Sequence, residues 1–476
     1  MTDISSRNRI RHLKCDEEKP ICRRCREDRM KCDGYAPSVK ASSQPYTNTK
    51  AESLSLIAVD HEVSNTALER HYFYHFCHWT CKQLSNSSDT SNFWMQYVLP
   101  LSHTSDPVRH AITAVGAAHR FFTAGSDTHS LQHMQVLTKQ YNKAISQIIP
   151  CLTVSSIHNI HCTLVCCLLF IAFESILGRY SECVRHLRAG NHLLTLPILA
   201  AGGKNCATTE KLKEMLSSLS VEASTFMDDN IISDEQRIWV TGRAKDTSNL
   251  SSGQFRDLDQ AASELRELEV QFTISTRLYR DEASSNNELP AVESEDGEIT
   301  ANDRAMDALF EDLQRRFKKW IARFDLTKRA LEYEQHPHTR SQQFLNLTLA
   351  QKFWSMNLYF VPEPCLDSTA DFLDAAKNLV KSLAKPSYFT FSLDGDLISG
   401  LSFVVRVCSD ADKRDRALTL LQSLNRREGF WDSREIAKMH QVTLSFDDFE
   451  SWYEMEVLGG VPGYLAKLAE VLKRTK

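Results

Sequence analysis

The sequence predicts an all-α protein, with a small cysteine-rich N-terminal module joined by a linker to a large multi-helix body. Apolar residues recur at spacings of three and four over most of the chain after residue 66, and strict alternation of apolar and polar residues is scarce. Four cysteines stand among Arg and Lys residues near the N-terminus. The 476 residues suffice for two or three domains, and their 42% hydrophobic content is ordinary for a soluble globular chain.

The helical spacing is clearest in three segments of the body, in which roughly a dozen helices are expected. In segment 68–79 one predicted face carries Leu68, Tyr72, Phe76 and Trp79. In segment 309–324 it carries Leu309, Leu313, Phe317, Trp320, Ile321 and Phe324. In segment 416–424 it carries Leu418, Leu421 and Leu424. Gly and Pro stand between these blocks, where helices end.

The longest apolar run, "CTLVCCLLFIAF" from Cys162 to Phe173, predicts a buried helix. It is well short of the roughly 20 residues that span a bilayer, so no membrane segment is expected. Residues 1–11 are polar and basic, so no secretory signal is expected either. The chain holds 14 cysteines, several of them scattered as in core packing. We therefore expect a reducing compartment, where clustered thiols bind metal and do not form disulfides.

Composition and charge divide the chain. The module is placed at 1–35, a Ser-, Pro- and Thr-rich flexible linker at 36–66 and the helical body at 67–476. Within the body we expect a loop at 245–253 and an acidic, disordered loop at 281–303. Residues 7–31 contain ten Lys and Arg against five Asp and Glu, a net charge of +5, so the remainder of this −5 chain carries −10. A basic head on an acidic body predicts that the head meets a polyanion.

The four N-terminal cysteines are spaced C-x6-C-x2-C-x6-C, at Cys15, Cys22, Cys25 and Cys32. A C-x2-C pair fits a tight turn that presents two sulfurs to one ion, and four thiolates complete a zinc tetrahedron. Pro20 shapes the loop between the two halves. The sequence therefore predicts a zinc site. The alternative is a set of four reduced cysteines in a disordered arm.

This segment resembles the fungal zinc binuclear cluster (Zn₂Cys₆) transcription factors. "RIRHLKCD" is similar to the family's basic helix before its third cysteine, and "CDGY" to the residues from its sixth. Ser5 and Asn8 stand where the family has its first and second cysteines. The resemblance implies two zinc ions in an intact motif, whereas the four remaining thiols imply one. A real loss of two ligands and an upstream exon that supplies "C-x2-C" are both open explanations.

The same resemblance implies contact with double-stranded DNA at CGG-type triplets. The helix that enters the major groove corresponds to residues 9–14, with Arg11 and His12 at the base-reading positions. Arg fits guanine bidentately, and neutral His is a weaker substitute. Phosphate contacts are expected from Arg9, Lys14, Arg23, Arg24 and Arg26. The alternatives are a solvated basic arm and a nuclear import patch.

The body resembles the fungal-specific transcription factor domain. The resemblance rests on "RVCSDADKRDRAL" and "NRREGFWDS" within 391–437, on "FWMQYVLPLSHTSDPVRHAITAVGAAHR", and on "CCLLFIAFESILGRYSECVRHLRAG". It implies a nuclear regulator of RNA polymerase II genes that contacts the transcription machinery and can form a homodimer.

Enzyme motifs are missing from the sequence: there is no G-x-G-x-x-G, P-loop, G-x-S-x-G or H-E-x-x-H. We therefore expect no enzyme. His71, His75 and His78 could ligate a metal, but packing at a helix seam is the favoured interpretation. A buried polar corner is expected from Arg426, Arg427, Glu428, Trp431 and Asp432. Two other functions stay open: a regulator that has lost DNA binding and acts by protein contacts, and a small-molecule-binding or enzymatic helical protein of a metabolic gene cluster.

Overall fold

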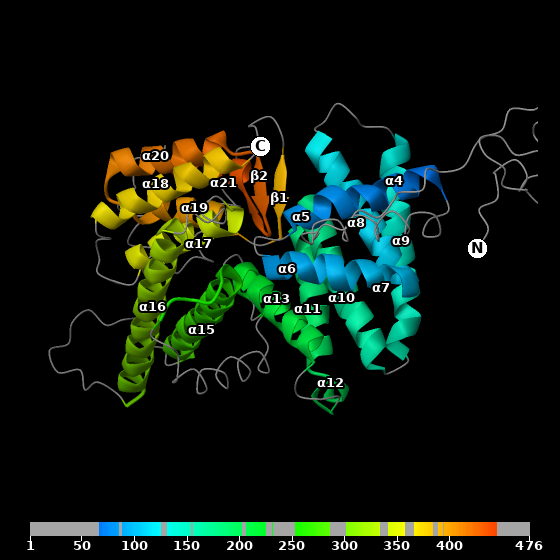
Figure 1. Cartoon of the computed structure of the whole chain (residues 1–476), viewed down its shortest axis with the longest axis horizontal. Helices are drawn as coiled ribbons and strands as arrows, with labels where there is room; N and C mark the ends of the chain where they lie inside the picture. Colours follow the sequence, from blue (N-terminus) through cyan, green and yellow to red (C-terminus); the bar gives the residue numbers. More distant parts are fainter. Residues whose placement is uncertain are drawn as a thin grey trace, which may run out of the picture. The chain divides into compact units, whose positions relative to one another are not determined.

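The fold is known from a computed structural model, shown in Figure 1. It describes residues 66–84, 88–124, 131–153, 156–201, 206–224, 231, 253–285, 301–333, 341–357, 366–383, 389–393 and 395–444. The chain divides into two compact units, Met1–Val59 and Asp60–Lys476, and every described residue belongs to the second. The predicted N-terminal module and nearly all of the predicted linker lie outside the described residues.

The first part of the described body is a set of packed helices. They are α4 (Ala67–His75), π-helix η1 (Phe76–Thr80), α5 (Cys81–Gln83), α6 (Ser88–Asn92), π-helix η2 (Phe93–Val98), α7 (Leu99–Thr104), α8 (Asp106–Ala124), α9 (Leu131–Thr153), α10 (Ile157–Ile176), α11 (Tyr180–Leu194), α12 (Pro197–Ala201) and α13 (Ala207–Ser224). Helix α4 starts at a capping box, in which the Thr66 side chain accepts from Glu69 N and Glu69 accepts from Thr66 N. Helix α8 packs on α4, α9 and α10.

The predicted face of segment 68–79 is right up to Phe76 and wrong at Trp79. Tyr72 and Phe76 are buried, whereas the Trp79 side chain is 62% exposed. The reason is η1, because a π-turn takes more residues per turn than an α-turn and rotates the following side chains off the stripe. The buried positions after Phe76 are therefore Cys77, Thr80 and Cys81.

Helix α10 forms the centre of this part and confirms the buried helix predicted from the apolar run. Every residue from Ile160 to Ile176 is buried. It is the one helix among the described residues that is long and apolar enough to cross a membrane, and 94% of that apolar window is buried inside the fold. It starts at Ser156, whose side chain accepts from Asn159 N at 3.1 Å. Helices α8, α9, α11 and α13 cover it.

Three long helices follow: α15 (Leu258–Ser285), α16 (Ala301–Tyr333) and α17 (Gln342–Asn357). Leu313, Phe317, Trp320 and Phe324 of α16 are buried, as the spacing predicts. Helix α17 has no polar stripe, because Phe344 and Trp354 join the core with α15 and α16, while Leu349 and Met356 join a second core with the helices after it. The acidic loop expected at 281–303 is helical at both ends, to Ser285 and from Ala301, and 286–300 lies outside the described residues.

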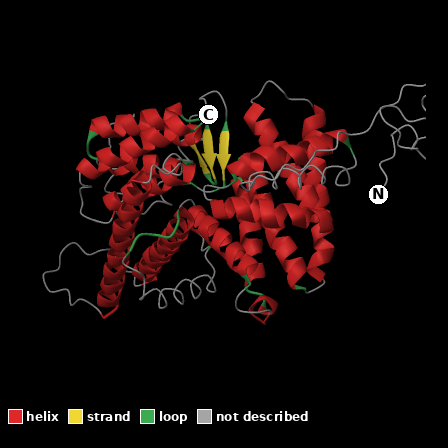
Figure 2. Cartoon of the chain, viewed as in Figure 1, coloured by secondary structure: helices red, strands yellow, loops and turns green. Residues whose placement is uncertain are grey.

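The last described part is helical with one small sheet. Its helices are α18 (Leu366–Ser382), α19 (Leu397–Val407), α20 (Ala411–Ser423) and α21 (Ser433–Leu444). The all-α prediction missed the three short strands β1 (Thr390–Ser392), β2 (Arg426–Glu428) and β3 (Trp431–Asp432), which stand out in Figure 2. Strand β2 lies between β1, parallel to it, and β3, antiparallel to it. Figure 1 shows this sheet between the helices of the first part and α19 to α21.

Candidate functional site

The site residues predicted for metal and DNA lie outside the described residues. This holds for the four cysteines, Cys15, Cys22, Cys25 and Cys32, and for the seven basic residues, Arg9, Arg11, His12, Lys14, Arg23, Arg24 and Arg26. The loop expected at 245–253 also falls outside, except for Gly253. Within the described residues, the structure shows the polar corner of the body, whose side chains bind the ends of several helices.

The three histidines of α4 and η1 do not gather into a metal site. His71 is exposed, His78 packs against the Tyr74 ring at 3.9 Å between centroids, and His75 is buried. His75 Nε2 lies 3.1 Å from Nδ1 of His119 on α8, and burial lowers the pKa of His75 to about 4. Among the described residues, no group of three or more His, Cys, Asp or Glu side chains is placed to hold a metal ion.

The polar corner is the β2–β3 hairpin, and its residues are buried as predicted. Side chains alternate between the two faces of a strand, so Arg426 and Glu428 point to one face and Arg427 to the other. Arg427 stands opposite Asp432 in the register of the two strands, which puts both on the same face. Two ion pairs result: Arg426 Nε to Glu428 Oε1 at 2.6 Å, and Arg427 Nη2 to Asp432 Oδ2 at 2.5 Å.

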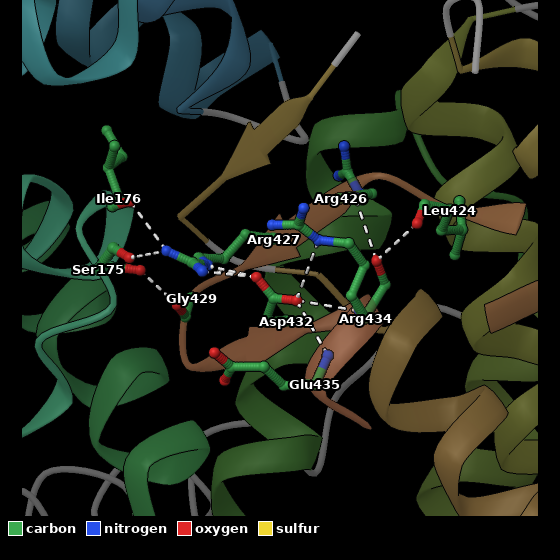
Figure 3. Close-up of polar contacts among 10 residues, drawn as sticks. Ser175, Ile176, Leu424, Arg426, Arg427, Gly429, Asp432, Arg434 and Glu435 are labelled. Atoms are coloured by element: carbon green, nitrogen blue, oxygen red, sulfur yellow. Dashed lines mark hydrogen bonds and ion pairs between the residues drawn. The ribbon is translucent and has the colours of Figure 1, made fainter. Parts of the chain in front are cut away.

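Arg427 reaches the C-terminal end of α10 (Figure 3). Its Nη1 donates to the backbone oxygens of Ser175 and Ile176, at 2.9 and 2.8 Å. The last carbonyls of a helix have no partner within the helix and carry partial negative charge, so a guanidinium satisfies them and complements the helix dipole. The Ser175 hydroxyl also donates to the backbone oxygen of Gly429, which fixes α10 to the hairpin turn.

Glu428 and Asp432 are acceptors for backbone N–H groups at two helix N-termini. Glu428 Oε2 accepts from the backbone N of Ile398 at 3.0 Å, in the first turn of α19. Asp432 Oδ1 accepts from the backbone N of Arg434 and Glu435, at 3.0 and 3.2 Å, and so caps α21. The hairpin therefore holds one helix C-terminus with a cation and two N-termini with anions.

Two glycines make the close approach possible. Gly178, just after α10, has φ of 73°, and Gly429, in the hairpin turn, has φ of 50°, both in the left-handed region that glycine adopts without strain. A Cβ on Gly429 would also overlap the carboxylate of Glu222 on α13. The oxygen Oε1 of Glu222 accepts from Phe430 N at 3.0 Å, so α13 is a fourth helix fixed to the hairpin. We name this set of contacts around 426–432 the helix-end junction.

The junction suits a structural task. The four charged side chains of its hairpin are buried and each is bonded to another side chain or to a helix end, which leaves none of them exposed for chemistry on a solute. The sequence pattern located the corner, but it did not reveal the partners Ser175, Ile176, Ile398 and Glu222. Three of those four contribute backbone atoms, which leave no signal in side-chain identity.

Two segments of the chain match known protein families. Residues 8–42 match the fungal Zn(2)-Cys(6) binuclear cluster domain, and residues 70–228 match the fungal specific transcription factor domain. The first match includes all four cysteines and all seven basic residues, and zinc is the metal that this domain binds. The second match runs from within α4 to the end of α13 and ends before the hairpin. No solved structure matches the chain.

Three curated relatives are fungal regulators. The chain is 28% identical over 205 residues to the aspercryptin biosynthesis cluster-specific transcription regulator atnN of Emericella nidulans, covering 39% of this chain and 33% of that protein. It is 25% identical over 202 residues to the transcription regulator lscL of Purpureocillium lilacinum, covering 38% and 46%. It is 28% identical over 116 residues to the Zn(2)-C6 fungal-type transcription factor afumD of Aspergillus fumigatus, covering 24% and 31%. The matches thus span less than half the length of each relative. With a match to the cluster domain followed by a match to the fungal specific transcription factor domain, the chain is similar to the fungal Zn(2)-Cys(6) transcription regulators.

Proposed function

We propose that the chain is a zinc-dependent, sequence-specific DNA-binding regulator of RNA polymerase II genes, and that it acts in the nucleus. The observation that carries the proposal is the order of the two matched domains, a cluster domain at 8–42 followed by a transcription factor domain at 70–228. The charge pattern supports it, because a net +5 over 7–31 on an otherwise acidic chain favours a polyanion at the head alone.

The zinc site consists of Cys15, Cys22, Cys25 and Cys32. Four thiolates fit one tetrahedral zinc and do not fit the two ions of a six-cysteine cluster, since Ser5 and Asn8 offer no thiolate. Zinc, when bound, cross-links the segments on either side of Pro20 and thereby orders a module too small to have a core. The module's boundaries are 1–35, with the linker at 36–66 and the body from 67.

The basic residues divide into two tasks. Arg11 and His12 read base edges of a CGG-type triplet in the major groove, and Arg9, Lys14, Arg23, Arg24 and Arg26 bind phosphates. The helical body supplies contacts to a second copy of the chain and to the transcription machinery. A dimer would place two modules on two half-sites, which raises affinity by effective concentration.

A second candidate is a regulator that acts by protein contacts without reading DNA. It is favoured by one observation, the Ser5 and Asn8 that stand at two ligand positions of the cluster. With those ligands gone, the helix 9–14 loses its covalent anchor through the metal at its N-terminal side.

The deciding experiment is fluorescence anisotropy of a labelled CGG-containing duplex with the purified full chain, at 50 and 200 mM salt, with a scrambled duplex as competitor. The DNA-reading proposal expects competition by the CGG duplex to exceed that by the scrambled one at both salt concentrations. Equal competition by both duplexes at every salt concentration would favour the second candidate, a regulator that acts by protein contacts. Elemental analysis of the same sample should give about one zinc per chain.

A further inference from the structure

A cavity of about 300 Å³ lies beside the helix-end junction. Helices α13, α15 and α17 line it, together with the start of α19 and Trp431 of β3. This volume is at the lower end of the range for small-molecule sites, and such sites combine an apolar wall with a few polar groups. The residues matched by the fungal specific transcription factor domain, 70–228, contribute only the α13 side of it.

Part of the wall is aromatic, and these rings are held by contacts of their own. Phe272, Phe353, Trp354 and Trp431 all line the cavity. The Trp354 ring stacks on Phe317 at 4.1 Å between centroids, and its Nε1 donates to Glu269 Oε1 at 2.9 Å. Phe272 meets Trp354 edge-on at 5.1 Å. A preformed wall of this kind costs little side-chain entropy when a planar or aliphatic guest binds.

One buried donor on the wall lacks a partner. Asn346 of α17 lines the cavity, and its Nδ2 is buried without a hydrogen bond. A buried amide donor left unpaired costs free energy that a ligand oxygen would recover. A carbonyl or hydroxyl oxygen on the guest would meet this requirement once the Asn346 amide turns its Nδ2 toward the cavity that it lines.

The charges of the lining select against anions. Three carboxylates line the cavity, those of Glu222, Glu269 and Asp396, against one guanidinium, Arg266. Arg266 is itself paired with Glu214, with its Nε 3.5 Å from Glu214 Oε1. A negatively charged guest would therefore be repelled in a partly dehydrated site, where charges interact more strongly than in water.

We propose that this cavity binds an uncharged, largely apolar small molecule that carries a carbonyl or hydroxyl oxygen, with that oxygen accepting from Asn346 Nδ2. The guest would contact Trp431 and Glu222, which belong to the junction, so binding should also stabilise the body. The proposal does not depend on DNA binding, because none of its residues belongs to the head.

The test uses two naphthalene dyes of similar size with the full chain. Prodan is uncharged and has one ketone oxygen, and 1-anilinonaphthalene-8-sulfonate is an anion. Prodan should bind saturably, with a blue-shifted emission and a raised melting temperature, and the sulfonate dye should bind at least about tenfold more weakly. Equal affinity for both dyes, or no saturable binding of prodan, would overturn the proposal.

Three variants localise the dye. Ala350→Phe fills the cavity from α17 and should abolish saturable prodan binding. Asn346→Leu, close in size to Asn, should weaken prodan about fivefold to tenfold through loss of one hydrogen bond. Asn142→Leu, on the exposed face of α9, is the matched control and should change nothing. If circular dichroism shows that Ala350→Phe does not fold, Asn346→Leu decides. Prodan affinity equal in the Asn346→Leu and Asn142→Leu variants would then overturn the proposal.

Discussion

The Arg427 guanidinium donates to the backbone oxygen of Ile176 at 2.8 Å, although 251 residues separate the two in the chain. A side chain near the C-terminus thereby completes the end of the central helix α10. The same guanidinium holds the Asp432 carboxylate that caps α21. Loss of this one side chain should therefore loosen two helices that belong to different parts of the body.

The first prediction is that Arg427→Ala destabilises the body by about 3–5 kcal/mol, the range for breaking a buried ion pair from one side. Asp432, whose side chain is only 3% exposed, would keep only the more distant Arg434, whose Nε lies 3.9 Å from Oδ1, and the carbonyls of Ser175 and Ile176 would each lose the guanidinium as a donor. Urea denaturation of the full chain, followed by circular dichroism, measures the free energy of unfolding.

The matched control for that variant is Arg416→Ala. Arg416 pairs with Asp374 on the surface, where both side chains are at least 40% exposed. Exposed pairs contribute at most about 1 kcal/mol, so the control should unfold nearly as the unaltered chain does. Equal losses in the two variants would contradict a structural role for the junction.

The second prediction concerns the π-helix η1. Phe76→Ala should cost about 3–5 kcal/mol, because the ring is fully buried, whereas Trp79→Ala should cost less than about 1 kcal/mol. Had the α-helical stripe continued as the spacing of Leu68, Tyr72 and Phe76 suggests, both rings would be core residues. Thermal unfolding of the two variants side by side separates the alternatives, and a large loss at Trp79 would contradict the π-turn.

These residues also show how far the sequence could predict the structure. Helical spacing is a local property, so the buried faces of α10 and α16 were predictable from it. A π-turn changes the number of residues per helical turn within a single turn, and the spacing of apolar residues alone does not predict it. The junction was predicted as a buried corner, but its Arg427 is held by the backbone oxygens of Ser175 and Ile176, which come from a distant segment. The cavity could not be predicted for a similar reason, because its lining comes from segments that are distant in the sequence, namely α13, α15, α17 and the residues around α19.

The third prediction is a pH dependence from His440 of α21. Its Nε2 lies 2.8 Å from the Ser402 hydroxyl, and burial, aided by Arg406, lowers its pKa from 6.5 to about 3. The unfolded chain therefore takes up this proton first. The stabilisation is complete above about pH 6.5 and is lost as the pH falls toward 3. The contribution to the slope is about 1 kcal/mol per pH unit between pH 5 and 6.

The measurement is the free energy of unfolding at pH 7, 6 and 5. His440→Gln, which keeps a polar partner for Ser402, should lower the slope below pH 6.5 by about that amount. His103→Gln, on the exposed side of α7, is the control and should leave the slope as it is. An unchanged slope in His440→Gln would show that this imidazole is hydrated or protonated in the folded chain.

The fourth prediction separates base reading from phosphate binding in the head. Arg11→Ala should lose about 1–3 kcal/mol on a CGG-containing duplex and reduce the preference for it over a scrambled duplex. Arg24→Ala, which removes a phosphate contact, should weaken both duplexes alike and reduce the salt slope by roughly one. Competition binding at two salt concentrations distinguishes the two outcomes, because Arg11→Ala changes sequence specificity, whereas Arg24→Ala changes only the electrostatic part of the binding free energy.

The repair of the two missing ligand positions completes this test. If the unaltered chain shows no sequence preference, Ser5→Cys combined with Asn8→Cys should restore it, because the six thiolates could then hold two zinc ions and anchor the helix 9–14. The zinc content measured by elemental analysis should rise from about one ion per chain to about two. A repaired chain that holds two zinc ions and still binds CGG and scrambled duplexes equally would refute the base-reading role of Arg11. A repaired chain that gains preference only while Arg11 is present would assign that role to this one side chain.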